Sequence, residues 1–371
     1  MKAVLTALAV SVVLSLAARA QTGTPAPATA PGLLVTTGSA APKGGATARV
    51  EDLRVLEGGV AEPFELERLG LAAVNANQLD RARALFEQAW KRGELPSAAY
   101  NLACLDARLG RADQAFARLE KAIAAGFDDG VSLEKDPDLG PLRGKPRFAS
   151  IVSGAAKNRA AGDAAAVKEG VFLLPKDKAL AVLLLLHDKE SDPFTVSGPF
   201  TDVALSHRLL VAAPRGPGRS AKRRFGWGSA DRAEKAIDAA VAAARAKAGD
   251  QKLPVFIVGV GRGGTEVLRV AARKPARTFA GVGSIGGPFD PGTAPNPAGL
   301  RGTPLFLGFS RDAAPAELAA GRRGIEVLRQ QGLRPIVAEW PGANSGLPKD
   351  AARAVKETLD AFAGMAPAAA R

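Results

Sequence analysis

From Ala165 onward the sequence alternates between short apolar runs and longer stretches with helical spacing, and this alternation constrains the fold more than any other feature. The apolar runs are nearly continuous, which is typical of strands buried on both faces of a parallel sheet. We expect strands near residues 170–174, 180–187, 208–213, 253–259, 279–285, 304–309 and 334–340. We expect helices near residues 230–247, 265–274, 315–331 and 349–363. The fold class predicted for residues 166–366 is therefore α/β, with a doubly wound, mostly parallel sheet.

A second pattern, in residues 57–156, is a repeat of helical segments. Matching positions recur at one fixed interval: Leu69 with Leu102, Gly70 with Ala103, Ala82 with Ala115, Phe86 with Leu119 and Ala89 with Ala122. With breaks at Asn77 and Gly110, the pattern resembles the tetratricopeptide repeat, whose helical pairs recur about every 34 residues. Residues 136–152 resemble the short capping element that follows such repeats in many bacterial proteins. The resemblance implies an N-terminal all-α domain that is either a docking surface for a protein partner or a helical spacer.

The sequence pattern at the N-terminus predicts that the protein is exported. Residues 1–20 combine Lys2, an apolar stretch and a small-x-small ending, as secretory signal peptides do. The apolar stretch falls short of the ~20 residues that a spanning helix needs, so we favour a cleaved signal over an uncleaved anchor. Residues 21–56 are rich in Pro, Gly, Thr and Ala and predict a flexible linker. We expect a periplasmic or secreted protein with no transmembrane helix after signal removal.

The amino-acid composition limits the kinds of functional site that the chain can form. Cys104 is the single cysteine, which excludes an internal disulfide, and its core-facing position predicts a buried side chain. With two histidines besides, the chain has no metal-ligand cluster, and we expect neither a metal nor a cofactor. The formal net charge of +13 favours anionic partners through long-range attraction.

The segment Gly259-Val260-Gly261-Arg262-Gly263-Gly264 follows an expected strand and opens an expected helix. This is the context of the G-x-S-x-G nucleophile elbow. The same residues spell the G-x-G-x-x-G of a dinucleotide site, which also requires an acidic residue about 20 positions further on, at the end of the next strand. That strand ends in Ser284-Ile285-Gly286-Gly287, without an acid, so the elbow is favoured.

Phrases around the elbow carry a family resemblance: "LLLLHD" at 183–188, "LLVAAPRGP" at 209–217, "FGWGSADRAEKAIDAAV" at 225–241, "VFIVGVGRGGTEVLRVA" at 255–271, "FAGVGSIGGPF" at 279–289, "RGTPLFLGFSRDAAPAE" at 301–317 and "AEWPGANSGLPKD" at 338–350. Together they resemble the phospholipase/carboxylesterase family of α/β-hydrolases over residues 167–363. In such enzymes a serine at the elbow attacks the ester, a histidine acts as base and an aspartate orients it.

The resemblance aligns two of the three catalytic positions with residues other than the family's serine and histidine. The serine position falls on Gly261, the histidine position on Ser345, and the acid position on or beside Asp312. The oxyanion side falls on His187 and Asp188, where the family has His-Gly, and on Arg262 after the elbow.

Each departure has a chemical consequence. Gly261 has no side chain with which to attack, and Ser345 cannot act as a base near neutral pH. Asp188 brings negative charge toward a place where an oxyanion would have to be stabilised. The leading hypothesis is therefore an exported, catalytically inactive homologue that acts by binding.

Two alternatives stay open. One is a working esterase that uses Ser284 as a displaced nucleophile near His187 and Asp312, since His207 precedes its strand at the opposite edge of the sheet. The other is a structural scaffold in which the helical repeats bind a protein partner.

A basic loop supplies a candidate ligand site. Residues 214–228 place cations beside Phe225 and Trp227, and the cations are Arg215, Arg219, Lys222, Arg223 and Arg224. In the resembled family this loop lies along the rim of the substrate cleft. Such a group would suit an anionic small molecule, a lipid head group or a glycan. We expect no nucleic acid, because the protein is predicted to be exported.

Overall fold

The computed structural model describes residues 62–189, 191–221, 224–287, 297–313, 315–341 and 351–365. The predicted signal peptide, the predicted linker at 21–56, Arg223 and Ser345 lie outside these residues. The described chain divides into a helical unit, which runs to Arg159 and also includes Ser220 and Ala221, and a sheet unit, which contains the other residues from Ala160 onward. Each unit has its own hydrophobic core.

The helical unit is built from antiparallel pairs. Its elements are α1 (Pro63–Asn75), α2 (Leu79–Gly93), α3 (Pro96–Arg108), α4 (Ala112–Ala124), α5 (Gly130–Lys135), the 3-10 helix η2 (Pro137–Leu142) and the first part of α6 (Pro146–Lys168). Asn77 and Gly110 stand in the turns within the two pairs with positive φ, 57° and 71°. Gly70 shows why a small residue recurs between paired helices, since a Cβ there would lie 2.4 Å from the ring of Phe86. The predicted all-helical N-terminal region is confirmed.

A buried polar cluster joins α3 to the segment after the pairs. The Tyr100 hydroxyl donates a 2.6 Å hydrogen bond to Oδ2 of Asp136, and the Cys104 sulfur lies 3.4 Å from the same oxygen. Oδ1 of Asp136 accepts the backbone N–H of Asp138 at the start of η2. Cys104 is buried, as expected, and burial raises the pKa of its thiol.

The sheet unit contains a seven-stranded sheet in the order β1-β3-β2-β6-β7-β8-β9. The strands are β1 (Val171–Leu173), β2 (Ala181–Leu186), β3 (Leu209–Ala213), β6 (Val255–Val260), β7 (Gly281–Ile285), β8 (Leu305–Ser310) and β9 (Ile336–Trp340). β1 pairs antiparallel with β3, and the other pairs are parallel. The seven strands of this sheet coincide with the predicted apolar runs, and the predicted α/β class with a mostly parallel sheet is confirmed.

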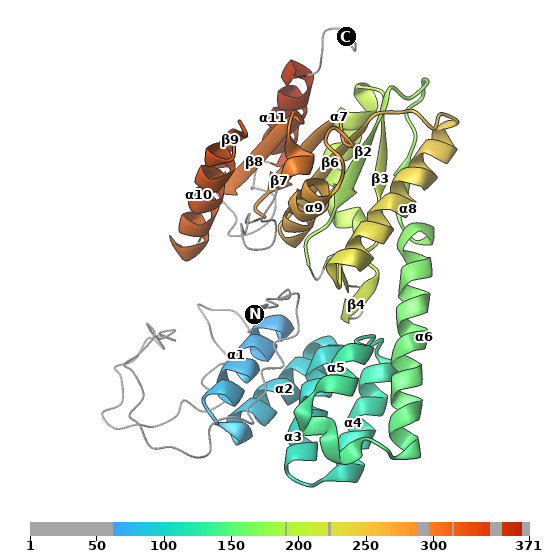
Figure 1. Cartoon of the computed structure of the whole chain (residues 1–371), viewed down its shortest axis with the longest axis vertical. Coiled ribbons are helices and arrows are strands. Elements are labelled where there is room, and N and C mark those ends of the chain that lie inside the picture. The colour runs from blue at the N-terminus through green and yellow to red at the C-terminus, as the bar shows by residue number, and fades with distance from the viewer. Residues whose placement is uncertain are drawn as a thin grey trace, which may run out of the picture. The chain divides into compact units, whose positions relative to one another are not determined.

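Helices cover both faces of this sheet (Figure 1). One face packs against α8 (Ala230–Ala248), α9 (Arg262–Arg273) and α10 (Pro315–Gln330). The other packs against α7 (Pro193–Ser206) and α11 (Ala351–Met365). Alternate strand residues enter the two cores, so both faces of the central strands are apolar. The sequence analysis missed α7 and the short hairpin β4 (Gly218–Ala221) with β5 (Arg224–Gly226).

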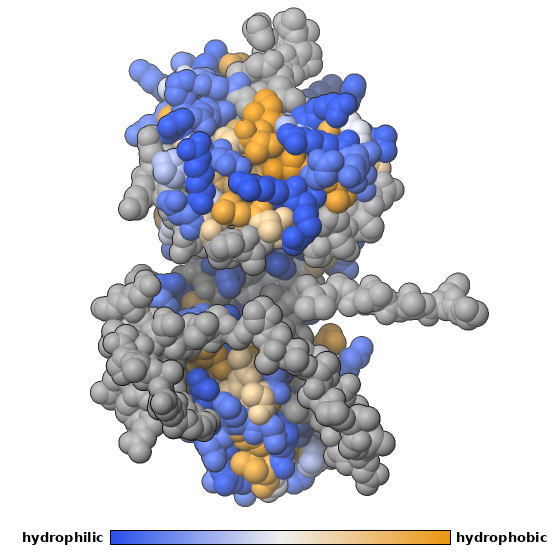
Figure 2. Space-filling view, turned by 90° about the vertical axis from the view of Figure 1, so that its left-hand side faces the viewer, coloured by the Kyte–Doolittle hydropathy of each residue, from blue (hydrophilic) through white to orange (hydrophobic). Residues whose placement is uncertain are grey.

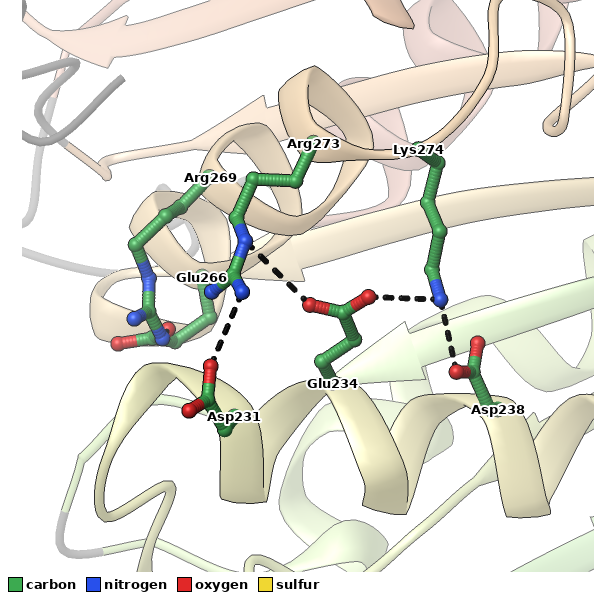
Figure 3. A network of polar contacts seen from close by, with 7 residues as sticks. All are labelled: Asp231, Glu234, Asp238, Glu266, Arg269, Arg273 and Lys274. Atoms are coloured by element: carbon green, nitrogen blue, oxygen red, sulfur yellow. Dashed lines mark hydrogen bonds and ion pairs between the residues drawn. The ribbon is translucent and has the colours of Figure 1, made fainter. Parts of the chain in front are cut away.

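An ion-pair network ties α8 to the end of α9 (Figure 3). Lys274 lies 2.8 Å from Glu234 and 2.7 Å from Asp238. Arg273 reaches Asp231 at 3.0 Å and Glu234 at 3.5 Å. The cations stand at the C-terminal end of α9, where the helix dipole favours positive charge.

β9 is an edge strand, and its Ile336 is 39% exposed. Figure 2 views the side of the sheet unit that carries β9 and α10 in Figure 1, and apolar surface is visible there among hydrophilic residues. Within the described part of the chain, no helix is both long and apolar enough to cross a membrane.

Candidate functional site

The turn between β6 and α9 has the strained backbone that exposes a nucleophile in hydrolase elbows. Gly261 has φ 53° and ψ −123°, a conformation that residues with a Cβ rarely adopt. Its N–H donates a 2.8 Å hydrogen bond to the carbonyl of Ile285 on β7. The flanking glycines allow the sharp approach, because a Cβ on Gly259 would lie 2.2 Å from the carbonyl carbon of Gly263. The predicted strand, turn and helix are therefore present.

The space beside Gly261 is filled by the carboxylate of Asp188. A Cβ on Gly261 would lie 2.2 Å from Cγ of Asp188 and 2.3 Å from each carboxylate oxygen. β2 and β6 are neighbouring parallel strands, so the residues that follow them meet at the same edge of the sheet. The side chain of Asp188 thus occupies the volume in which the side chain of an elbow nucleophile would begin.

Backbone N–H groups hold this carboxylate. Oδ1 of Asp188 accepts the N–H of Arg262 at 2.6 Å and the N–H of Lys189 at 2.7 Å. In an acyl-transferring elbow, the N–H of the residue after the nucleophile stabilises the oxyanion. Here that donor is already bound to an anion of the chain itself.

The charges around the site are partly desolvated. Burial raises the pKa of the Asp188 carboxyl, while its two backbone hydrogen bonds and the charges of Lys189 and Arg262 act in the opposite direction. The guanidinium of Arg262 pairs with Glu266, with Nε 3.1 Å from Oε1. Glu266 is buried and also pairs with Arg269, whose pKa burial lowers to about 10. Sequence reasoning missed Glu266, although an acid among the apolar residues of α9 was a visible signal.

His187 is fully buried and engaged by the backbone at both ring nitrogens. Nδ1 donates to the carbonyl of Asp188 at 2.6 Å, and Nε2 accepts the N–H of Gly216 at 2.9 Å. Burial lowers the pKa of the ring to about 4. The indole of Trp227 is tilted by 32° against the His187 ring, with the ring centres 4.8 Å apart, and its N–H donates to the carbonyl of His187 at 2.9 Å. This neutral imidazole fixes the end of β2 in place.

The structure does not assemble the alternative constellation of Ser284, His187 and Asp312. Ser284 is buried within β7, and its hydroxyl donates to the carbonyl of Gly287 at 3.2 Å. Asp312 follows β8 at the same edge of the sheet but is exposed, and its N–H donates to Ser310 Oγ. His207 is exposed beyond the end of α7, with Nδ1 2.8 Å from the carbonyl of Val203.

The described side chains of the basic loop differ in exposure. Arg215 pairs with Glu169 at 2.5 Å and stacks over the ring of Phe225 at 4.3 Å. Trp227 is buried, whereas Arg219 and Arg224 are exposed. Elsewhere in the described residues, no group of three or more His, Cys, Asp or Glu side chains is placed to hold a metal ion.

The strand order, the antiparallel first strand and the backbone at Gly261 together define an α/β-hydrolase fold for the sheet unit. No family model and no curated protein matches the sequence. Among solved structures, an uncharacterized protein from Bacillus cereus ATCC 10987 is 14% identical, and the match covers 81% of this chain and 99% of that chain with a TM-score of 0.44.

Two further matches are named as hydrolases. Esterase PE8 is 17% identical over 52% of this chain and 98% of that chain, with a TM-score of 0.44. The Bacillus cereus carboxylesterase is 14% identical over 52% of this chain and 94% of that chain, with a TM-score of 0.41. The activities in those names belong to those proteins.

Proposed function

We propose that this chain is an exported α/β-hydrolase homologue without esterase activity, which acts by binding. The observation that carries the proposal is the carboxylate of Asp188 beside Gly261, in the volume where a nucleophilic side chain would begin. The elbow backbone persists without its nucleophile, so the fold is kept while the means of attack is lost.

Acyl transfer requires a nucleophile, a base and free donors for the oxyanion. Gly261 supplies no nucleophile, and both nitrogens of His187 are bonded to the backbone. The N–H of Arg262 is already bound to Asp188. Loss of a triad serine or histidine alone costs on the order of a million-fold in turnover, and the occupied donor adds to that loss.

An esterase built on Ser284 would need two rearrangements. The hydroxyl would have to leave the carbonyl of Gly287, and His187 would have to break its bonds to Asp188 and Gly216. These bonds lie in the interior, where a polar group left without a partner costs about 1–3 kcal/mol. The geometry therefore supports binding over turnover.

The helical unit is proposed to provide a docking surface for a protein partner. Its support is the stacking of two helical pairs, which resemble tetratricopeptide repeats, and the η2 segment that follows them.

The test is hydrolysis of p-nitrophenyl acetate and a long-chain p-nitrophenyl ester by the purified protein. We expect rates equal to those of buffer, and equal rates for Ser284→Ala and for the control Ser150→Ala on the exposed surface of α6. Turnover by the wild-type protein that persists in Ser150→Ala and vanishes in Ser284→Ala would overturn the proposal.

A further inference from the structure

The two oxygens of the Asp188 carboxylate have different surroundings. Oδ1 accepts both backbone hydrogen bonds, from Arg262 and Lys189. Within the described part of the chain, Oδ2 accepts no hydrogen bond, and the side chain is only partly buried. The carboxylate is thus fixed through one oxygen and has acceptor capacity left on the other.

The charges of Lys189 and Arg262 act on this carboxylate, but neither side chain makes an ion-pair contact with it. Among the described residues, no lysine or arginine side chain forms an ion pair with Asp188. The guanidinium of Arg262 pairs with the buried Glu266 instead. A half-buried, immobilised carboxylate of this kind gains most from a ligand that brings its own positive charge and N–H donors.

The position of the group suits a ligand site. Asp188 follows β2 at the carboxyl edge of the parallel sheet, where open α/β sheets bind their ligands. Gly261 is the reason that the carboxylate fits, because any side chain there would collide with it. The carboxylate of Asp188 thus fills the space that the absent side chain of Gly261 leaves at the elbow.

We infer that Asp188 is the binding group for an ammonium-bearing ligand at the elbow, an inference that rests on the proposed binding function. The charge of the site is thereby the reverse of that in an esterase, whose elbow stabilises a developing anion. An anionic ligand is disfavoured at this point, because the donor N–H groups are taken and the carboxylate repels it. The ligand class therefore differs from the anions expected for the basic loop.

The experiment compares three probes of one shape on the full chain: benzylammonium, benzyl alcohol and benzoate, by isothermal titration calorimetry. Asp188→Asn removes the charge but keeps an oxygen that can accept from Arg262 and Lys189, so the local fold is expected to survive. The matched control is Asp202→Asn on the exposed surface of α7. Thermal unfolding of each variant, measured without probe, separates loss of binding from loss of structure.

We expect benzylammonium to bind the wild type and Asp202→Asn, and to bind Asp188→Asn about tenfold or more weakly, as a lost hydrogen bond to a charged group implies. Benzyl alcohol and benzoate should bind the wild type more weakly than benzylammonium does. No binding of benzylammonium at concentrations up to about 10 mM, equal binding to a folded Asp188→Asn, or equal binding of benzoate would overturn the inference. Ester turnover would instead refute the proposed function, so the two failures are distinguishable.

Discussion

Placing a serine at the elbow by Gly261→Ser should destabilise the sheet unit and yield no esterase activity. A Cβ at this position would lie 2.2 Å from Cγ of Asp188, so the carboxylate must leave. The backbone conformation with φ 53° adds strain of roughly 1–3 kcal/mol for a residue with a side chain. The departing carboxylate leaves the N–H of Arg262 without its acceptor, which costs about 1–3 kcal/mol if no water replaces it. We expect a total loss of about 3 kcal/mol.

A control separates strain from collision. Gly249→Ser places the same side chain at a positive φ of 68°, with no atom within 4 Å of the new Cβ. Gly249 has ψ 17° and so adopts the left-handed helical conformation, which a serine tolerates better than the backbone of Gly261, and this variant should lose about 1 kcal/mol. Urea unfolding followed by tryptophan fluorescence in a Trp90→Phe background would report on Trp227 and Trp340, which both lie in the sheet unit.

A double-mutant cycle tests whether the collision with Asp188 causes the loss of stability in Gly261→Ser. In an Asp188→Ala background the collision is absent, so Gly261→Ser should cost less than in the wild type, by about 1 kcal/mol or more. Additive effects, within about 0.5 kcal/mol, would refute the reasoning, because they would mean that the carboxylate does not occupy the space beside Gly261.

Three further predictions concern pH, a buried hydroxyl and salt. Burial raises the pKa of Asp188 above its ordinary 3.8 in the folded state, so the folded state binds the proton more tightly than the unfolded state does. The wild type should therefore lose stability relative to Asp188→Asn as pH rises from about 3.8 through the raised value. A constant difference in unfolding free energy between the two proteins, measured by denaturant titrations across that range, would contradict this prediction. Tyr100→Phe should destabilise the helical unit by about 1–3 kcal/mol, because it removes the O–H donor to Oδ2 of Asp136 and leaves that oxygen only the weak S–H donor of Cys104. Unchanged unfolding monitored at Trp90 would argue against the bond. Lys274→Gln should destabilise the sheet unit by less than about 1 kcal/mol at low salt, and by less still in 1 M salt, because salt screens its ion pairs. A loss of stability that does not depend on salt would exclude an electrostatic origin.

The fold was largely predictable because its signals are local. β2 is apolar throughout and buried throughout, so its short run indicates a central strand without reference to any other segment. α7 was missed because Gly198 and Pro199 interrupt its pattern, and the helix forms because Pro193 starts it, Asp192 caps it and its apolar side chains reach the sheet. In that case tertiary packing overrides local propensity.

The candidate site was predictable only in part. The glycine at position 261 and the negative charge of Asp188 could be recognised from the sequence, but the contact between the two could not. They are far apart in the chain, and their contact depends on the pairing of β2 with β6. Burial of Trp227 against His187 likewise depends on how the chain after β3 folds back on the end of β2.

The contact between Asp188 and the elbow satisfies a backbone donor at the start of α9. The N–H of Arg262 lies at the start of α9, where helix N–H groups have no partner within the helix. In an enzyme such a donor has to stay available for the reacting group, which leaves it poorly satisfied in the resting state. Here Asp188 bonds it permanently and places a negative charge at the positive end of the helix dipole. The contact that fills the elbow therefore also satisfies the first backbone donor of α9, and Gly261 is what makes it possible, because only a residue without a side chain leaves room for that carboxylate.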